Sequence, residues 1–66
     1  MLKITLNGEP KEISAGITIR GLLDSLSISG PVAVELNRKV CPKAFHSETL
    51  INDGDAIEIV TIVGGG

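Results

Sequence analysis

The sequence predicts an α+β fold in which one helix packs across one face of a mixed β-sheet. The chain of 66 residues has room for one small domain. Nine Ile, five Val and four Thr give a high content of β-branched residues, which favour strands. A single segment has the apolar spacing of a helix, and it lies between segments that are typical of strands.

The first expected strand is followed by a tight turn. Apolar and polar residues alternate over residues 2–6, which is the period of a half-buried strand. Asn7-Gly8 follows directly and favours a two-residue hairpin, because both residues tolerate a positive φ. The return strand is expected over residues 11–13, and Pro10 before it suits an edge strand.

One helix is expected over residues 17–26. Thr18 is placed to act as its N-cap, because a threonine hydroxyl can accept a hydrogen bond from an amide of the first turn. Ile17 and Leu22 then have the spacing of a hydrophobic staple across that cap. The apolar stripe expected to face the sheet consists of Ile19, Leu22, Leu23 and Leu26.

Three further strands are expected, over residues 32–36, 39–41 and 56–63, with a turn at Asn37-Arg38. The order of elements is satisfied by a ubiquitin-like β-grasp roll with about four to five strands, in which the first and last strands pair in parallel at the centre. We expect residues 1–63 to form this domain and residues 64–66 to form a flexible tail.

Residues 43–53 have no clear hydrophobic period, which predicts a loop with one helical turn. Phe45 and Leu50 are expected to fill the core, and His46 is expected to face solvent. Cys41 is expected to pack as a small buried hydrophobe rather than to act as a nucleophile or persulfide carrier.

The composition excludes several classes of function. One cysteine and one histidine provide neither a disulfide framework nor a zinc cluster. A net charge of −2 and a single aromatic residue give no footprint for nucleic acid. Because the chain has no long apolar run, we expect a cytoplasmic protein without a membrane partner. A small basic cluster, Arg38, Lys39 and Lys43, is either a solvated turn or a contact for an acidic partner.

The three glycines after the last strand are the most unusual feature. Gly64, Gly65 and Gly66 lose much entropy on ordering, so we expect a free tail that can be inserted into a narrow tunnel of a second protein. A terminal carboxylate on Gly66 is ionised and inert at neutral pH, and it reacts only after activation, most simply as an acyl-adenylate made with ATP. A frayed or vector-derived end is the alternative.

The last expected strand has two distinct faces. Ile57 and Ile59 share one face, and Glu58, Val60 and Ile62 share the other. If Glu58 is exposed, Val60 and Ile62 are exposed as well, and apolar residues grouped beside a reactive end indicate a docking surface for a partner. A bulge or a sheet twist that buries them is the alternative.

Several segments of the chain, taken together, resemble one known family. They are residues 4–9 (ITLNGE), 18–26, 32–37 (VAVELN) with Pro42 beyond, 53–60 (DGDAIEIV) and the three terminal glycines. Each segment alone is weak, but in this order and at this length the chain resembles the ThiS family of sulfur carriers in thiamine thiazole biosynthesis, over essentially its whole length.

The resemblance implies a β-grasp fold and a reaction cycle carried out by partners. An adenylating enzyme of the ubiquitin-activating type would use ATP to convert the Gly66 carboxylate into an acyl-adenylate. Sulfur from a cysteine desulfurase route would displace AMP and leave a thiocarboxylate, which thiazole synthase would accept from the inserted tail. The chain would be a co-substrate and not an enzyme, with no bound cofactor of its own.

Three other functions remain open at this point. A carrier of the molybdopterin synthase type has a similar fold and tail but is usually longer. A protein modifier would join its activated Gly66 to a lysine of a target. A passive binding module would not use the tail, so deletion of Gly66 would leave its activity unchanged.

Overall fold

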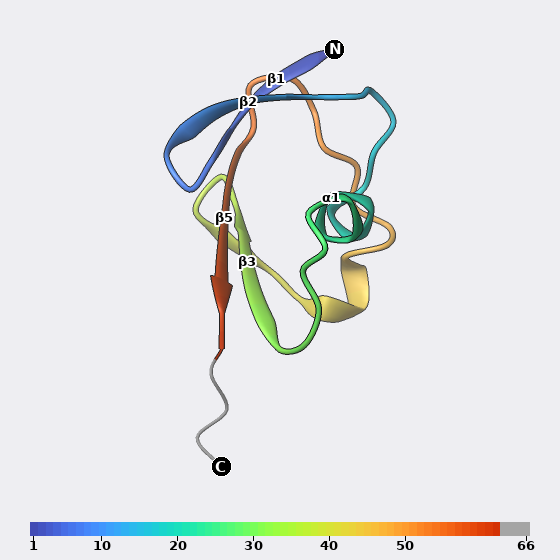
Figure 1. Cartoon of the computed structure of the whole chain (residues 1–66), viewed down its shortest axis with the longest axis vertical. Coiled ribbons are helices and arrows are strands. Elements are labelled where there is room, and N and C mark those ends of the chain that lie inside the picture. The colour runs from blue at the N-terminus through green and yellow to red at the C-terminus, as the bar shows by residue number, and fades with distance from the viewer. Residues whose placement is uncertain (63–66) are drawn as a thin grey trace.

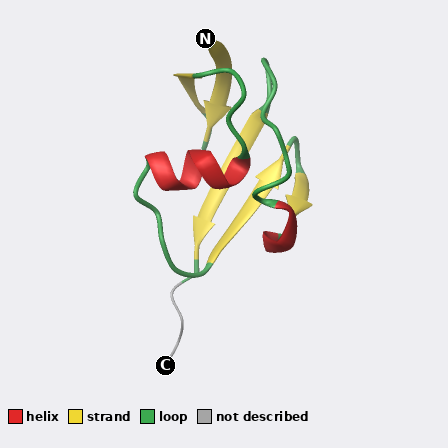
Figure 2. Ribbon diagram, turned by 90° about the vertical axis from the view of Figure 1, so that its right-hand side faces the viewer, coloured by secondary structure: helices red, strands yellow, loops and turns green. Residues whose placement is uncertain are grey.

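The computed structural model describes residues 1–62, which form a mixed sheet with a helix across one face (Figure 1, Figure 2). The strand order is β2-β1-β5-β3-β4. β1 and β5 are parallel, whereas the other neighbouring pairs are antiparallel, which confirms the predicted fold class. The elements are β1 (Leu2–Leu6), β2 (Glu9–Ile13), α1 (Ile19–Ser25), β3 (Val32–Leu36), β4 (Lys39–Cys41), the 3₁₀-helix η1 (Lys43–Phe45) and β5 (Ala56–Thr61).

Two tight turns close the antiparallel hairpins. Asn7 and Gly8 have φ values of 51° and 82°, and Asn37 and Arg38 have φ values of 53° and 69°. Positive φ at both central residues is typical of the type I′ turn, whose twist matches that of the flanking strands. Both predicted turns are therefore confirmed, and Pro10 lies in β2 at the edge of the sheet.

The helix α1 begins where its predicted cap is. Thr18 Oγ1 accepts a hydrogen bond from the Gly21 amide at 3.1 Å. A Cβ at Gly21 would lie 2.8 Å from Ile17 Cγ1, so this glycine leaves room for Ile17 over the first turn. The predicted stripe faces the sheet, with Ile19, Leu22 and Leu23 buried and Leu26 half-buried.

The core lies between α1 and the inner face of the sheet, as Figure 2 shows. Residues alternate between buried and exposed along β5, and β1 and β3 each bury their central residue, as expected for strands with one covered face. The buried apolar residues are Ile4, Ile13, Ile19, Leu22, Leu23, Val34, Cys41, Ile51, Ile57 and Ile59.

Two expectations for the segment between β4 and β5 are wrong. Phe45 and Leu50, expected in the core, are 52% and 56% exposed. His46, expected in solvent, is buried with 3% of its surface exposed. The expected helical turn is present as η1.

Hydrogen bonds of this segment explain why His46 is buried while Phe45 and Leu50 are exposed. Its backbone carbonyls accept hydrogen bonds from the first two amides of α1 at 3.0 and 2.9 Å, so the segment is tied to the helix start. The imidazole Nε2 of His46 lies 2.9 Å from the Cys41 carbonyl oxygen, which holds the ring inside. Ile51 is buried in the core, and Leu50, its neighbour in the chain, is exposed.

Candidate functional site

β5 is the central strand of the sheet (Figure 1), and in the sequence it is the element before the three C-terminal glycines. On one side, β3 pairs with it from Ile57 to Thr61. On the other side, β1 pairs only with Ala56 and Ile57. Within the described chain, the second half of β5 therefore has a neighbouring strand on one edge only.

The side chain of Asn7 continues the ladder where β1 ends. Its Oδ1 accepts a hydrogen bond from the Ile59 amide at 2.7 Å, and its Nδ2 donates one to the Ile59 carbonyl at 3.3 Å. The carboxamide thus supplies one acceptor and one donor, as a further residue of β1 would. Because Asn7 also forms the turn, a single residue links the turn of the first hairpin to the distal half of β5.

Asn37 holds the beginning of β5 from the opposite side. Its amide donates to the Ala56 carbonyl at 2.7 Å, and its Oδ1 accepts from the Ala56 amide at 2.8 Å. Its Nδ2 donates to Oδ1 of the buried Asp55 at 3.0 Å, while Asp55 Oδ2 accepts from the Asn52 amide at 2.7 Å. The asparagines of the two hairpin turns together fix the position of the tail-bearing strand.

Of the predicted docking residues, Glu58 and Val60 lie on the outer face of β5, whereas Ile62 follows the strand and borders a depression on the helix side of the sheet. Glu58 is exposed, and Val60 and Ile62 keep 61% and 52% of their surface in solvent. Val60 lies opposite Ala33 on β3, so its outer neighbour is also a small apolar residue. A docking role for these residues stays a prediction, which their exposure permits.

Two carboxylates face each other on this surface. Glu58 is paired in register with Glu35 of β3, and both side chains are exposed. Within residues 1–62, neither carboxylate has an ion-pair partner, since the ion pair found there joins Arg20 to Asp24. Like charges directly opposite each other destabilise a sheet, so the face retains a negative charge at some cost in stability.

The predicted reactive tail, Gly64, Gly65 and Gly66, lies outside the described residues, as does Val63. The Ile62 amide donates to the Pro31 carbonyl at 2.9 Å, so hydrogen bonding on the β3 side extends one residue beyond β5. The path of the chain is therefore defined up to Ile62.

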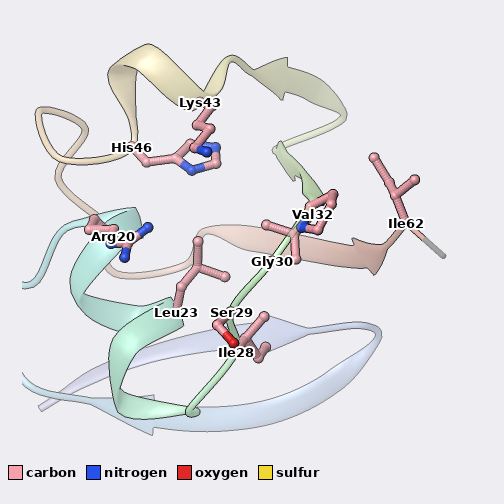
Figure 3. A pocket seen from close by; sticks show the side chains of 10 residues that line it. Arg20, Leu23, Ile28, Ser29, Gly30, Val32, Lys43, His46 and Ile62 are labelled. Carbon is pink, nitrogen blue, oxygen red and sulfur yellow. The ribbon is translucent and has the colours of Figure 1, made fainter. Parts of the chain in front are cut away.

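A depression of about 500 Å³ opens beside Ile62 on the helix side of the sheet (Figure 3). Leu23 and Val32 are among its apolar lining residues, and Arg20 and Lys43 bring positive charge to it. The buried His46 also lines it. Lys43 of the sequence-derived basic cluster lies here, whereas Arg38 and Lys39 do not line the depression.

Comparison with known proteins shows which family the chain belongs to. Residues 4–66 match the ThiS family. The chain belongs to that family. A crystal structure of the thiamine biosynthesis protein ThiS from Geobacter metallireducens matches it with a TM-score of 0.84 and 32% identity, over 98% of this chain and 100% of that one. The β-grasp fold is thereby confirmed for this ThiS-family chain.

Two relatives of this chain differ in the share of their own length that is similar to it. The sulfur carrier protein ThiS of Escherichia coli is 26% identical over 98% of this chain and 100% of its own. A thiazole synthase of Paramagnetospirillum magneticum is 42% identical over 98% of this chain. The ThiS-family chain spans only 20% of the length of that thiazole synthase.

Cys41 and the other potential ligands of this ThiS-family chain form no metal centre in the described part. Cys41 is buried, with its Sγ 3.7 Å from Thr49 Oγ1, in agreement with the predicted packing role. No group of three or more His, Cys, Asp or Glu side chains within residues 1–62 is placed to hold a metal ion. The one α-helix within residues 1–62 is α1. It has seven residues, whereas a helix that spans a membrane needs roughly 20.

Sequence reasoning missed the two asparagine contacts with β5 and the facing pair of carboxylates. Asn7 was recognised as a turn residue, but its side chain reaches a strand 52 positions away. The register that places Glu35 opposite Glu58 also depends on strands distant in the chain. The sequence does show an Asn at the first central position of each two-residue turn. Such an Asn is usually explained by the positive φ of the turn, so it did not indicate a contact with β5.

Proposed function

We propose that this ThiS-family chain is a sulfur carrier for thiamine biosynthesis and that Gly66 carries the sulfur as a thiocarboxylate. The observation that carries the proposal is the family match, which extends through the last glycine of the sequence. The fixed position of β5 supports it, because two asparagine side chains anchor the strand that precedes Gly64 and Gly65. These two glycines serve as the arm that enters a partner.

The chemistry takes place on enzymes that bind the chain. A carboxylate oxygen of Gly66 attacks the α-phosphorus of ATP on a ubiquitin-activating-type adenylating enzyme, and pyrophosphate leaves. A persulfide supplied by a cysteine desulfurase route then attacks the acyl carbon, and AMP leaves. A thiol attacks the outer sulfur of the resulting acyl disulfide, so that the thiocarboxylate is released and a new disulfide forms. The chain contributes the acyl group, acts as a co-substrate in the cytoplasm and needs no cofactor of its own.

Thiazole synthase is the proposed acceptor of the sulfur. Support comes from the thiazole synthases of Paramagnetospirillum magneticum and Magnetococcus marinus, in which a segment similar to this chain makes up 20% of the protein. Glu58, Val60 and Ile62 provide the proposed contact, because they are exposed and lie directly before the tail. Docking there would direct the glycines toward the partner's active site.

Deletion of Gly66 tests the carrier function. The shortened chain should lose sulfur transfer completely, because the acyl carbon moves to a different position and leaves the reach of the adenylating site. Its midpoint of thermal unfolding should match that of the parent chain. Undiminished transfer, or a large loss of stability in the deletion variant, would contradict the proposal.

The docking surface can be tested with a matched pair of exposed valines. Val60→Asp should weaken binding to thiazole synthase about tenfold or more, as expected for a charge placed at an apolar contact. Val40, which is 70% exposed on the outer strand β4, provides the control Val40→Asp. Equal weakening by both variants, or unfolding of the Val60 variant, would exclude a docking contact centred on the end of β5.

A further inference from the structure

The backbone of β5 directs its hydrogen-bonding groups to alternate sides. Ala56 accepts from Asn37, and the Ile62 amide donates to Pro31, so even-numbered residues of this strand face β3. Ile57 accepts from the Asn7 amide at 2.9 Å, so odd-numbered residues face the side of β1. The N–H and C=O of Thr61 therefore point away from β3, because Thr61 is the next odd-numbered residue.

Within residues 1–62, no hydrogen bond is formed by the N–H or C=O of Thr61 on that side. β1 pairs with β5 through Ile57, and the Asn7 side chain then satisfies Ile59. Beyond it the chain turns at Gly8 into β2, so no strand of the described chain pairs with Thr61 on that side. We define the β5 notch as the open edge of β5 at Thr61, between Val60 and Ile62.

The β5 notch differs from the two outer edges of the sheet. β2 carries Pro10 together with charged neighbours, and β4 begins with Lys39 and is followed by Pro42. Proline and charge at edges are the usual protection against pairing with another strand. The notch has neither, because its residues are isoleucine, valine and threonine.

We propose that the β5 notch is a strand-addition site, at which an extended segment of thiazole synthase pairs with β5. This inference rests on the proposed function. A carbonyl of the partner accepts a hydrogen bond from the Thr61 N–H, and a partner N–H donates to the Thr61 carbonyl. Apolar side chains of the added strand pack on Val60, which is 61% exposed on the outer face of the sheet.

Strand addition matches the chemistry of the notch better than a docked helix does. A helix satisfies its own backbone groups and would leave the Thr61 N–H and C=O without partners. An added strand satisfies both and fixes the direction of β5 at the point where it leads into the glycines. The main-chain bonds thus position the tail, independently of the side chains around it.

Amide hydrogen exchange of the unmodified chain, alone and with purified thiazole synthase, tests the inference. In the free chain, the Thr61 amide should exchange much faster than the Val60 and Ile62 amides, which face β3. Addition of thiazole synthase should slow exchange at Thr61 at least tenfold. Protection of Thr61 that rises with the concentration of the free chain would instead mean pairing between two copies and would overturn the assignment to thiazole synthase.

Thr61→Pro and Thr61→Ala separate the backbone from the side chain. Proline removes the N–H that points into the notch and leaves the bonds to β3, whereas alanine keeps the N–H. The proline variant should bind thiazole synthase about tenfold more weakly, and the alanine variant should bind like the parent chain. If the parent binds and both variants bind equally well, without protection of Thr61, only the strand-addition site is refuted. If the parent itself does not bind, the proposed partnership fails as well.

Discussion

Asn7→Ala removes the contact that joins the first hairpin to the distal half of β5. Two hydrogen bonds to Ile59, at 2.7 and 3.3 Å, disappear, and both backbone groups of Ile59 lose partners in a partly buried place. Their loss costs about 2 kcal/mol, at roughly 1 kcal/mol for each bond. Alanine at a φ of 51° adds about 1 kcal/mol of backbone strain. The free energy of unfolding should therefore fall by about 3 kcal/mol, a large share of the total for a small domain.

Asn7→Gly separates the two contributions. Glycine adopts a positive φ without steric cost, so this variant should lose only the hydrogen-bond part, about 2 kcal/mol. Urea unfolding followed by circular dichroism gives both values, and amide exchange at Ile59 shows whether the loss is local. A glycine variant within 0.5 kcal/mol of the parent, which is about the lower limit for one hydrogen bond, would refute the role assigned to Asn7.

Three further substitutions test the packing around the site. Glu35→Gln should raise the free energy of unfolding by about 0.2–0.5 kcal/mol at low salt and less at high salt, because it relieves repulsion from Glu58; a decrease in urea titrations would contradict that pairing. His46→Ala should lower it by about 2–3 kcal/mol through a cavity and an unpaired carbonyl, and a loss below half of that would show that the ring is dispensable. Gly21→Ala should destabilise the chain by about 1 kcal/mol in spite of its better helix propensity, whereas the same change in an Ile17→Ala background should stabilise it, as thermal unfolding of the four chains would show.

Local patterns predicted most of the fold. The alternation over β1, the residues of the two turns and the Thr18 cap are each decided within a few positions, so the sequence contains the necessary information. The segment between β4 and β5 behaves differently. Apolarity alone placed Phe45 inside, whereas the buried position belongs to His46, whose ring meets a backbone carbonyl that only the folded chain brings near.

Only part of the candidate site could be predicted from the sequence, because the rest depends on contacts between distant segments. The period of two along the last strand separated Ile57 and Ile59 from Val60, and the structure has the first two buried and the last exposed. The asparagine contacts could not be derived, because Asn7 reaches its partner across 52 positions and Asn37 across 19. Such contacts follow from the strand order, which local patterns do not contain.

The intact mass of the chain after incubation with ATP, its adenylating enzyme and a sulfur source tests the central claim most directly. Sulfur carriage predicts a gain equal to the difference between one sulfur and one oxygen atom, located on Gly66 by fragmentation, and its loss after transfer to thiazole synthase. An unchanged mass, or products linked to lysine through Gly66, would contradict the assignment as a sulfur carrier.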